Sequence, residues 1–414
     1  MKLTISRVLG LAVAGVILLG PSTGMASNVA PGAPEVRLKG RLLVDGVWQT
    51  ASSAGPEDDD HLGLIRVRQA FLGLDAKFND RLSLRFEGGA ANNDAFVWDE
   101  AALEYRHSPG VLVTVGNLKA AALENLTSTR SIAFLERGPF GDLITDPFLA
   151  SVQVRANRGP LAATFAIQGE SFNNLGLDFG GGPSPGATDR LGATLRLAGA
   201  TPTGDTRRLH VGAWARVRDF GGGAARAYAA RPGTSAGRAG DWLGTGPLAD
   251  RDFTVGIEGA YLADRFWVQG EAGYLKAGRG GSAPSGADPW ILAGYVYAGW
   301  SVSGEPRGYD SARALVTAPR ISNPLSRGGA GAVDLLVRYD FADLTEVGRS
   351  ATGAEALGAA GKAGVYQGLT LGAVWRPEPG YRLLLNLSQA RVVNAPRQAD
   401  ITLRLLQIRA QYDF

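Results

Sequence analysis

The sequence predicts an all-β fold, a single 16-stranded antiparallel transmembrane β-barrel. Three observations predict it. Sixteen segments alternate between apolar and polar residues, so that one face of each strand would meet lipid and the other water. The connections between these segments alternate between short and long. No stretch beyond the N-terminal region can form a membrane helix, because the longest uncharged run, 289–304, has 16 residues and a spanning helix needs about 20.

The alternation is clearest in the first predicted strand, where Val36, Leu38 and Trp48 share one face and charged residues occupy the other. The last predicted strand has Tyr412 and Phe414 in frame with its apolar face, where a barrel strand places aromatic residues at the membrane interface. Helical spacing would mix the two sets. The predicted strands are 35–49, 62–78, 81–91, 96–107, 110–117, 150–158, 160–171, 189–199, 206–220, 251–263, 264–277, 289–302, 331–343, 365–377, 379–392 and 398–414.

One segment departs from strict alternation. In 62–78 the frame slips near Gln69, which predicts a β-bulge. A soluble β-sandwich is the alternative fold for alternating strands. A continuous up-and-down pattern of this length would require several sandwiches, and no linker divides them, so the barrel is favoured.

The predicted connections fall into a short set and a long set, as in a barrel with tight periplasmic turns and longer extracellular loops. Both chain ends then lie on the periplasmic side, because the number of strands is even. The connection 303–330 breaks this order, since it is long and yet falls on the side of the short turns. Either strands are missed there or the connection has a function of its own. The short set is 79–80, 108–109, 159, 263–264 and 378.

The N-terminus has the features of a signal peptide. Two basic residues precede a short apolar run at 8–20, and small residues up to Ala26 fit a cleavage site. The run is too short to span a membrane, so an uncleaved anchor is the less favoured alternative. We therefore expect residues 1–26 to be a cleaved signal peptide and residues 27–414 to form one barrel domain in the bacterial outer membrane.

Composition argues against several other classes of protein. The formal net charge is only +3, which is not the basic surface of a nucleic-acid-binding protein. The chain has no cysteine, and its three histidines, His61, His107 and His210, are far apart in the sequence. No metal site, cofactor or catalytic motif is therefore expected, and the protein is predicted not to be an enzyme.

Arginine is the remaining source of chemistry. Of the 42 basic residues only six are lysines. Arginine keeps its charge at any relevant pH and can bind phosphate or carboxylate oxygens through two parallel N–H groups, and rings of cationic side chains in a narrow pore favour anions. Composition leaves open the alternative that these arginines face solvent or lipopolysaccharide, or pair with acids of the wall. The candidate acids are Glu100, Glu104, Glu258 and Glu271.

Three motifs resemble those of the phosphate-selective porin O and P family. The longest, at 116–138, reads GNLKAAALENLTSTRSIAFLERG and is similar to the family pattern G-Q-F-K, L-T-S-x-R and F-M-E-R. The second, at 303–310, reads SGEPRGYD and is similar to T-G-E-S-R-x-Y-D. The third, at 382–386, reads RLLLN and is similar to R-L-M-L-N. The resemblance extends from about residue 35 to residue 414.

The resemblance implies a trimeric, 16-stranded outer-membrane porin with two extracellular loops and one periplasmic loop folded into the lumen. The periplasmic one would give 303–330 its function, and we expect at least Arg313 or Arg320 to line the channel. The chain departs from the family where Ala120 and Ala121 replace a proline, and in its few lysines, which weakens the expectation of strict phosphate selectivity. The anion-binding, pore-lining residues implied by the resemblance are Lys119, Arg130 and Arg137 in the first loop, and Arg216, Arg218, Arg226 and Arg238 near the second.

We therefore expect a porin for the passive diffusion of small anions, with phosphate or polyphosphate first. The same fold leaves open a broad, weakly selective porin for organic anions. An outer-membrane barrel without transport, acting as a scaffold or adhesin, is the alternative from a different class. The expected partners are small anions, outer-membrane lipid and lipopolysaccharide, and further copies of the chain in a homotrimer, with no nucleic acid.

Overall fold

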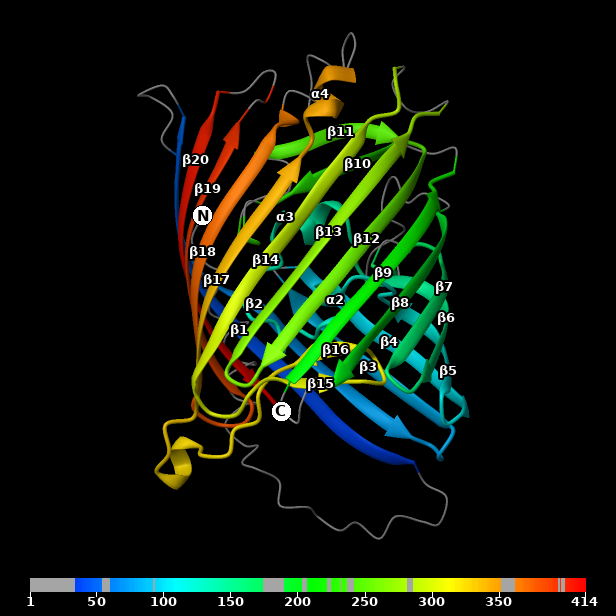
Figure 1. Ribbon diagram of the computed structural model, residues 1–414, viewed down its shortest axis with the longest axis vertical. Helices are drawn as coiled ribbons and strands as arrows, with labels where there is room; N and C mark the ends of the chain where they lie inside the picture. Colours follow the sequence, from blue (N-terminus) through cyan, green and yellow to red (C-terminus); the bar gives the residue numbers. More distant parts are fainter. Residues whose placement is uncertain are drawn as a thin grey trace.

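The structure is a computed structural model in which the chain closes into a barrel (Figure 1). The expected signal peptide at 1–26 and the candidate Arg238 lie outside the residues that the structure describes. The described residues are 34–53, 60–91, 94–173, 190–202, 207–221, 225–231, 233–236, 242–280, 286–350, 362–393, 395 and 399–414.

Sixteen strands form the wall, and all neighbouring pairs are antiparallel. The predicted fold class is confirmed, and each predicted segment overlaps one wall strand. In chain order the wall strands are β1 (Glu35–Ser53), β2 (Asp60–Lys77), β3 (Leu82–Ala91), β4 (Asp94–Ser108), β5 (Val111–Leu118), β6 (Leu149–Arg158), β7 (Leu161–Gln168), β8 (Leu191–Pro202), β9 (Arg207–Asp219), β12 (Arg251–Ala263), β13 (Phe266–Gly278), β14 (Trp290–Ser303), β17 (Ala332–Asp343), β18 (Val365–Arg376), β19 (Tyr381–Val393) and β20 (Ile401–Asp413).

The two faces of the wall differ as the alternation predicts. On the outside, Leu38, Ile65 and Leu72 expose 70%, 76% and 67% of their surface. On the inside, Asp45 and Arg409 are buried in a filled lumen. An apolar outer face and a polar interior are the arrangement that a barrel needs in order to span a membrane, because the lipid meets only the outer side chains.

The frame slip in the second strand is a β-bulge, as predicted. Leu43 of β1 pairs with Gln69, whereas the next residue, Val44, pairs with Val67, so Arg68 has no partner in the ladder. Because side chains alternate with a period of two, this extra residue changes which of the following positions face outward. The apolar face of β2 therefore continues past the bulge.

β1 and β20 close the barrel at a tight seam. The Gly40 nitrogen donates to the Phe414 oxygen at 3.0 Å, and the Phe414 nitrogen donates to the Gly40 oxygen at 3.1 Å. A Cβ atom at position 40 would lie 2.5 Å from the Phe414 ring. Glycine at position 40 therefore leaves room for the Phe414 ring on the seam, and a larger residue would displace the ring.

Two long connections reach the lumen from opposite rims (Figure 1). We call residues 119–148, which follow β5, the inner loop. We call residues 304–331, which follow β14 on the rim of the short turns, the periplasmic loop. Among the described residues no helix is long and apolar enough to cross a membrane. The short elements, which the sequence did not predict, are α2 (Leu123–Leu126) and α3 (Gly138–Leu143) in the inner loop, β15 (Gly308–Asp310), β16 (Leu315–Thr317) and η1 (Leu325–Arg327) in the periplasmic loop, and β10 (Arg226–Ala230), β11 (Leu243–Ala249) and α4 (Thr345–Ser350) elsewhere.

Candidate anion pore

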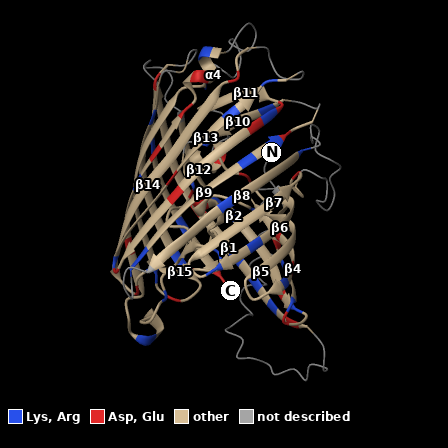
Figure 2. Cartoon of the chain, turned by 45° about the vertical axis from the view of Figure 1, so that its right-hand side comes forward, with Lys and Arg blue, Asp and Glu red and all other residues tan. Residues whose placement is uncertain are grey.

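A cavity of about 190 Å³ lies inside the barrel, between the inner loop and the part of the wall that runs from β1 to β8. Nine cationic side chains and four carboxylates line it, an excess of five positive charges when all are ionised. Figure 2 shows charged residues of both signs along the strands and at both rims, so this excess is a local property of the cavity. The cations are Lys39, Arg41, Arg85, Lys119, Arg130, Arg137, Arg155, Arg196 and Arg313, and the acids are Glu87, Asp99, Glu100 and Glu104.

Acids of the wall pair with arginines of other wall strands. Arg85 on β3 lies 3.0 Å from Glu100 and 2.9 Å from Glu104, both on β4. Arg41 on β1 pairs with Asp99 on β4. In this part of the lumen the arginines therefore do pair with acids of the wall, which was one of the alternatives that composition left open. Paired in this way, Arg41 and Arg85 add little to the positive potential of the cavity.

Arg130 of the inner loop reaches the same cavity but is also paired. Its Nη1 and Nη2 donate to the two carboxylate oxygens of Glu87 at 2.9 and 3.0 Å. A third hydrogen bond reaches the Gly40 oxygen at 3.2 Å. This side chain therefore ties the inner loop to β1 and β3, and its charge is largely compensated.

Lys119 of the inner loop has no carboxylate partner in the described part of the chain. Its Nζ donates to the Asn125 oxygen at 3.4 Å and lies 4.6 Å from the centre of the Phe148 ring. Burial, followed by the nearby charge of Arg137, lowers the pKa of Lys119 to about 7. The charge that this lysine contributes to the cavity therefore changes near neutral pH.

Arg137 and Arg155 also face the cavity without a carboxylate partner among the described residues. Arg137 donates to the backbone oxygens of Glu124 and Thr127, at 3.1 and 2.8 Å. Arg155 on β6 forms no hydrogen bond or ion pair in the part of the chain that the structure describes. The sequence reasoning missed Arg155. The alternation of the predicted strand 150–158 could have identified it, because Arg155 and Gln153 are on the same, water-facing side of that strand.

Arg216 and Arg218 lie on β9 and belong to a second charged cluster. Asp146 of the inner loop accepts hydrogen bonds from Arg216 at 2.8 Å and from Arg218 at 2.6 Å. Asp146 also lies 2.6 Å from Arg190, and Arg218 pairs with Asp252 on β12. These two predicted residues hold the inner loop to the wall and are not among the lining residues of the cavity.

Two further predicted residues lie away from the lining. Arg226 is exposed at the start of β10, and Arg320 is exposed in the periplasmic loop. The remaining one, Arg238, lies outside the described residues. A motif gives the position of a residue in the chain and not the direction of its side chain, which explains why these positions could not be separated by sequence.

The tip of the periplasmic loop enters the barrel and contributes Arg313 to the cavity. Arg196 on β8 donates to the Arg313 and Ala314 oxygens at 3.0 and 2.9 Å. His210 Nδ1 on β9 lies 2.8 Å from the Tyr309 hydroxyl. The β15–β16 hairpin is therefore fixed against the inside of the wall. The periplasmic loop, whose length the sequence did not explain, therefore reaches the lumen.

Arginines of the last strands hold the inner loop on the opposite side of the lumen. Arg338 on β17 donates to Glu124 Oε1 at 2.6 Å and to the Arg137 oxygen at 2.5 Å. Arg382 on β19 donates to two carbonyl oxygens of the loop at 2.9 and 2.6 Å, and Arg409 on β20 donates to a third at 2.8 Å. These contacts draw the loop toward β17–β20, which leaves the cavity on the side of β1–β8.

The remaining two wall acids differ in their partners. Glu258 on β12 lies 2.5 Å from Arg196, so this wall acid pairs with an arginine, as composition left open. Glu271 on β13 instead accepts hydrogen bonds from the Leu123 and Glu124 nitrogens at 2.6 and 2.8 Å. It therefore satisfies backbone donors at the start of α2 and positions the inner loop.

A closed barrel with an apolar outer face and a charged lumen narrowed by an inner loop is the architecture of an outer-membrane porin. The particular family follows from a match of residues 40–414 to the family model for phosphate-selective porin O and P. The chain belongs to this family of phosphate- and anion-selective channels. The family expected from the motifs is confirmed, together with its place in the outer membrane.

The chain is also similar to individual proteins. An uncharacterized protein of Caulobacter vibrioides is 28% identical over 320 residues, which covers 75% of this chain and 62% of that relative's length. Among solved structures, a loop L8 deletion mutant of OmpT from Vibrio cholerae has a TM-score of 0.57 at 12% identity and covers 92% of this chain and 100% of its own. The anion-selective porin from Comamonas acidovorans has a TM-score of 0.54 at 13% identity, with coverages of 92% and 100%. DcaP of Acinetobacter baumannii has a TM-score of 0.53 at 13% identity, with coverages of 94% and 99%. At these identities the structural similarity shows the fold alone.

Proposed function

We propose that this porin lets small anions diffuse passively across the outer membrane, with phosphate or polyphosphate preferred. An anion entering the cavity exchanges part of its hydration shell for N–H donors of the lining. Several weak sites in series, rather than one tight site, let the ion leave again. The description of the Comamonas acidovorans structure as an anion-selective porin agrees with this proposal.

One observation carries the proposal: Lys119, Arg137 and Arg155 face one cavity and have no carboxylate partner among the described residues. A fixed positive charge in a narrow space with low-dielectric walls attracts anions and repels cations. Hydroxyl and amide groups of the lining offer further donors for phosphate oxygens. These are Thr114, Ser128, Thr129, Gln153 and Thr164.

Charge reversal tests the proposal. The double variant Arg137→Glu, Arg155→Glu should shift the reversal potential of a planar bilayer under a potassium chloride gradient toward cation preference. Arg320→Glu is the matched control, because this arginine is exposed outside the cavity, and it should leave the potential unchanged. An unchanged potential in the double variant would contradict the proposal.

A second experiment identifies the preferred anion. Chloride current through single channels is recorded while inorganic phosphate is added, because a bound phosphate blocks the path of chloride. Strong block at low phosphate concentration supports phosphate preference. Anion selectivity without block favours a broad, weakly selective porin for organic anions. A lumen that carries no current favours the scaffold or adhesin.

We also propose that the porin is a homotrimer. The family resemblance supports this assembly, and one solved form of OmpT from Vibrio cholerae, at 12% identity and a TM-score of 0.52, is described as a trimer. Electrophoresis in detergent without boiling should give a band of trimer size that converts to monomer on heating. A band of monomer size in both conditions would argue against the trimer.

A further inference from the structure

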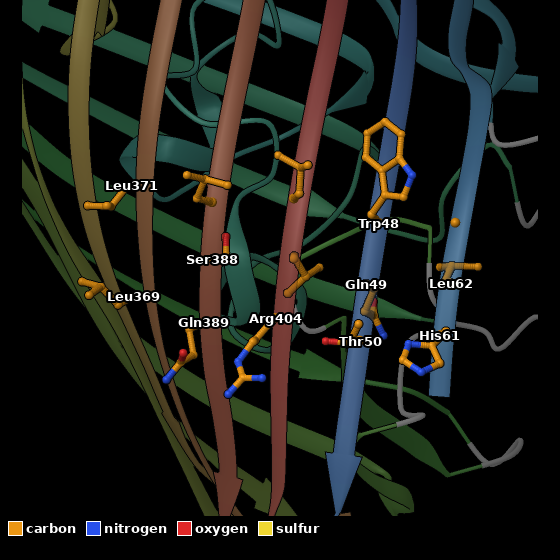
Figure 3. Close-up of a pocket in the computed structure, with 14 residues that line it drawn as sticks. Trp48, Gln49, Thr50, His61, Leu62, Leu369, Leu371, Ser388, Gln389 and Arg404 are labelled. Atoms are coloured by element: carbon orange, nitrogen blue, oxygen red, sulfur yellow. The ribbon is translucent and has the colours of Figure 1, made fainter. Parts of the chain in front are cut away.

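A concave groove of about 680 Å³ lies on the outer wall of the barrel, near the rim that carries the long connections (Figure 3). It crosses five adjacent strands, β18, β19, β20, β1 and β2. In the outer membrane the outer wall meets lipid wherever no other copy of the chain covers it, and the rim opposite the short turns lies in the outer leaflet. The proposed pore does not involve the groove, because the pore lies inside the barrel and the groove lies on the outer face of the wall.

The row of residues nearer the rim is polar. Arg404 on β20 is the register partner of Gln389 on β19 and of Thr50 on β1, and Thr50 is the partner of His61 on β2. All four side chains are exposed on the outer face, and Figure 3 shows them at one level across the strands. Hydrogen-bond donors from four strands therefore lie side by side.

The next row, farther from the rim, is apolar. Leu406 on β20 is the register partner of Leu387 on β19 and of Trp48 on β1, and Leu387 is the partner of Leu371 on β18. On β2 the row ends at Gly63, where a Cβ atom would meet the Trp48 ring at 3.5 Å. The floor of the groove is therefore lined by three leucines and the face of an indole.

Arg404 is the charged residue of the groove. It is exposed and forms no hydrogen bond or ion pair with the part of the chain that the structure describes. Its neighbour Arg391, one row nearer the rim, instead pairs with Asp400 at 3.0 Å. An arginine on the lipid face is unfavourable in the hydrocarbon and acceptable near the headgroups, where a phosphate can neutralise it.

Two other grooves on the outer wall provide a comparison. The groove beside Leu195, Val255 and Ile257 has no charged residue in its lining. The groove beside Phe165 and Phe253 has charges of both signs, with three basic and three acidic residues. The Arg404 groove alone among these three combines a basic residue with no acid. Its charge therefore complements an anionic ligand, and its floor complements a hydrocarbon chain.

We propose that this groove binds one phosphorylated glycolipid of the outer leaflet, of the lipid A type. A phosphate would accept hydrogen bonds from Arg404, with His61, Thr50 and Gln389 around it. An acyl chain would lie on the apolar row. A second copy of this chain fits less well, because it would have to bring an acid to Arg404 across a membrane-facing surface.

Native mass spectrometry of the detergent-purified porin, titrated with bis-phosphorylated lipid A, tests this site. The wild type should bind one lipid A per protomer. Arg404→Gln should weaken binding by up to about fivefold, the upper end of the range for one exposed ion pair. Lys276→Gln is the matched control, because Lys276 is an exposed outer-wall cation of the groove that has acids, and it should bind as the wild type does. Arg404→Lys should bind between the wild type and Arg404→Gln.

Dephosphorylated lipid A separates the phosphate from the acyl chain. It should bind the wild type no more tightly than bis-phosphorylated lipid A binds Arg404→Gln, and the difference in affinity between the two lipids should be smaller for Arg404→Gln than for the wild type. Equal losses in Arg404→Gln and Lys276→Gln would overturn the site, as would a loss of oligomer in Arg404→Gln, which would mean that another copy covers the groove. The anion selectivity of Arg404→Gln should be unchanged, so this test is independent of the pore proposal.

Discussion

The lumen has two sides that use arginine differently. Toward β17–β20, Arg338 and Arg409 are buried and donate to carboxylates and carbonyl oxygens of the inner loop. Toward β1–β8, Arg137 and Arg155 face a cavity and have no carboxylate partner in the described part of the chain. The comparison shows that an arginine can either hold the inner loop in place or add positive charge to the cavity beside that loop. The partner decides which, because a paired charge is cancelled locally.

Removing an anchoring arginine should have the largest effect. Arg338→Met leaves Glu124 and Asp340 buried without their cation, which destabilises by roughly 3 to 5 kcal/mol when a buried pair is broken. The methionine keeps apolar contact with Tyr295, whose ring centre lies 4.3 Å from the guanidinium carbon. We expect a lower free energy of unfolding in urea and a higher single-channel conductance, because the inner loop is released. Arg320→Met, at an exposed position, should change neither.

Removing the tip of the periplasmic loop should have the next largest effect. Replacement of 309–316 by a short glycine turn removes the hairpin and Arg313 together. Single-channel conductance should rise because the lumen widens. Anion preference should fall because ions then pass farther from the charged lining, even though the replacement removes Asp310 together with Arg313. Arg313→Gln alone should lower the preference without the rise in conductance. If conductance and selectivity both stay at wild-type values in the deletion, the hairpin lies outside the conducting path.

Neutralising an unpaired cation should have a smaller effect, on ion selectivity, and comparing it with the removal of a paired arginine tests whether pairing cancels the charge. Arg155→Gln should lower the chloride-to-potassium permeability ratio by about two- to fivefold, since one unscreened charge at pore distance contributes about 1 kcal/mol. The double variant Arg130→Gln, Glu87→Gln removes one positive and one negative charge that are paired. Arg41, which also contacts Glu87, keeps Asp99 as its partner. The double variant should therefore leave the ratio near that of the wild type. Equal changes in both variants would show that pairing does not decide the contribution of an arginine.

Changing the pH should have the smallest effect. The pKa of Lys119 is lowered to about 7 by burial, so its charge is present below that pH and lost as the pH rises through it. Anion preference in bilayer recordings should therefore fall when the pH is raised from about 6 to about 8, a range that includes the pKa of about 7. Lys119→Arg should keep the higher preference at both pH values, and Lys119→Gln should show the lower, high-pH preference at both. A pH response that persists in Lys119→Arg would point to another group.

The sequence by itself determined the wall. Alternation with a period of two is a local property, and it predicted all sixteen strands. A slip of that alternation near Gln69 located the bulge at Arg68. Counting strands put 303–330 on the rim of the short turns, where its length had no ordinary explanation. Local alternation also marks Arg155 as facing water, although that signal went unused.

Only the tertiary structure decided which cations stay unpaired. Arg130 meets Glu87, 43 residues earlier in the chain, and Arg338 meets Glu124, 214 residues earlier. Barrel closure and the path of the inner loop bring these partners together, and alternation encodes neither. Arg155 and Arg338 therefore look alike in the sequence, since both occupy water-facing positions of strands. Their roles differ because an ion pair depends on distances between segments, which the order of residues along one strand does not contain.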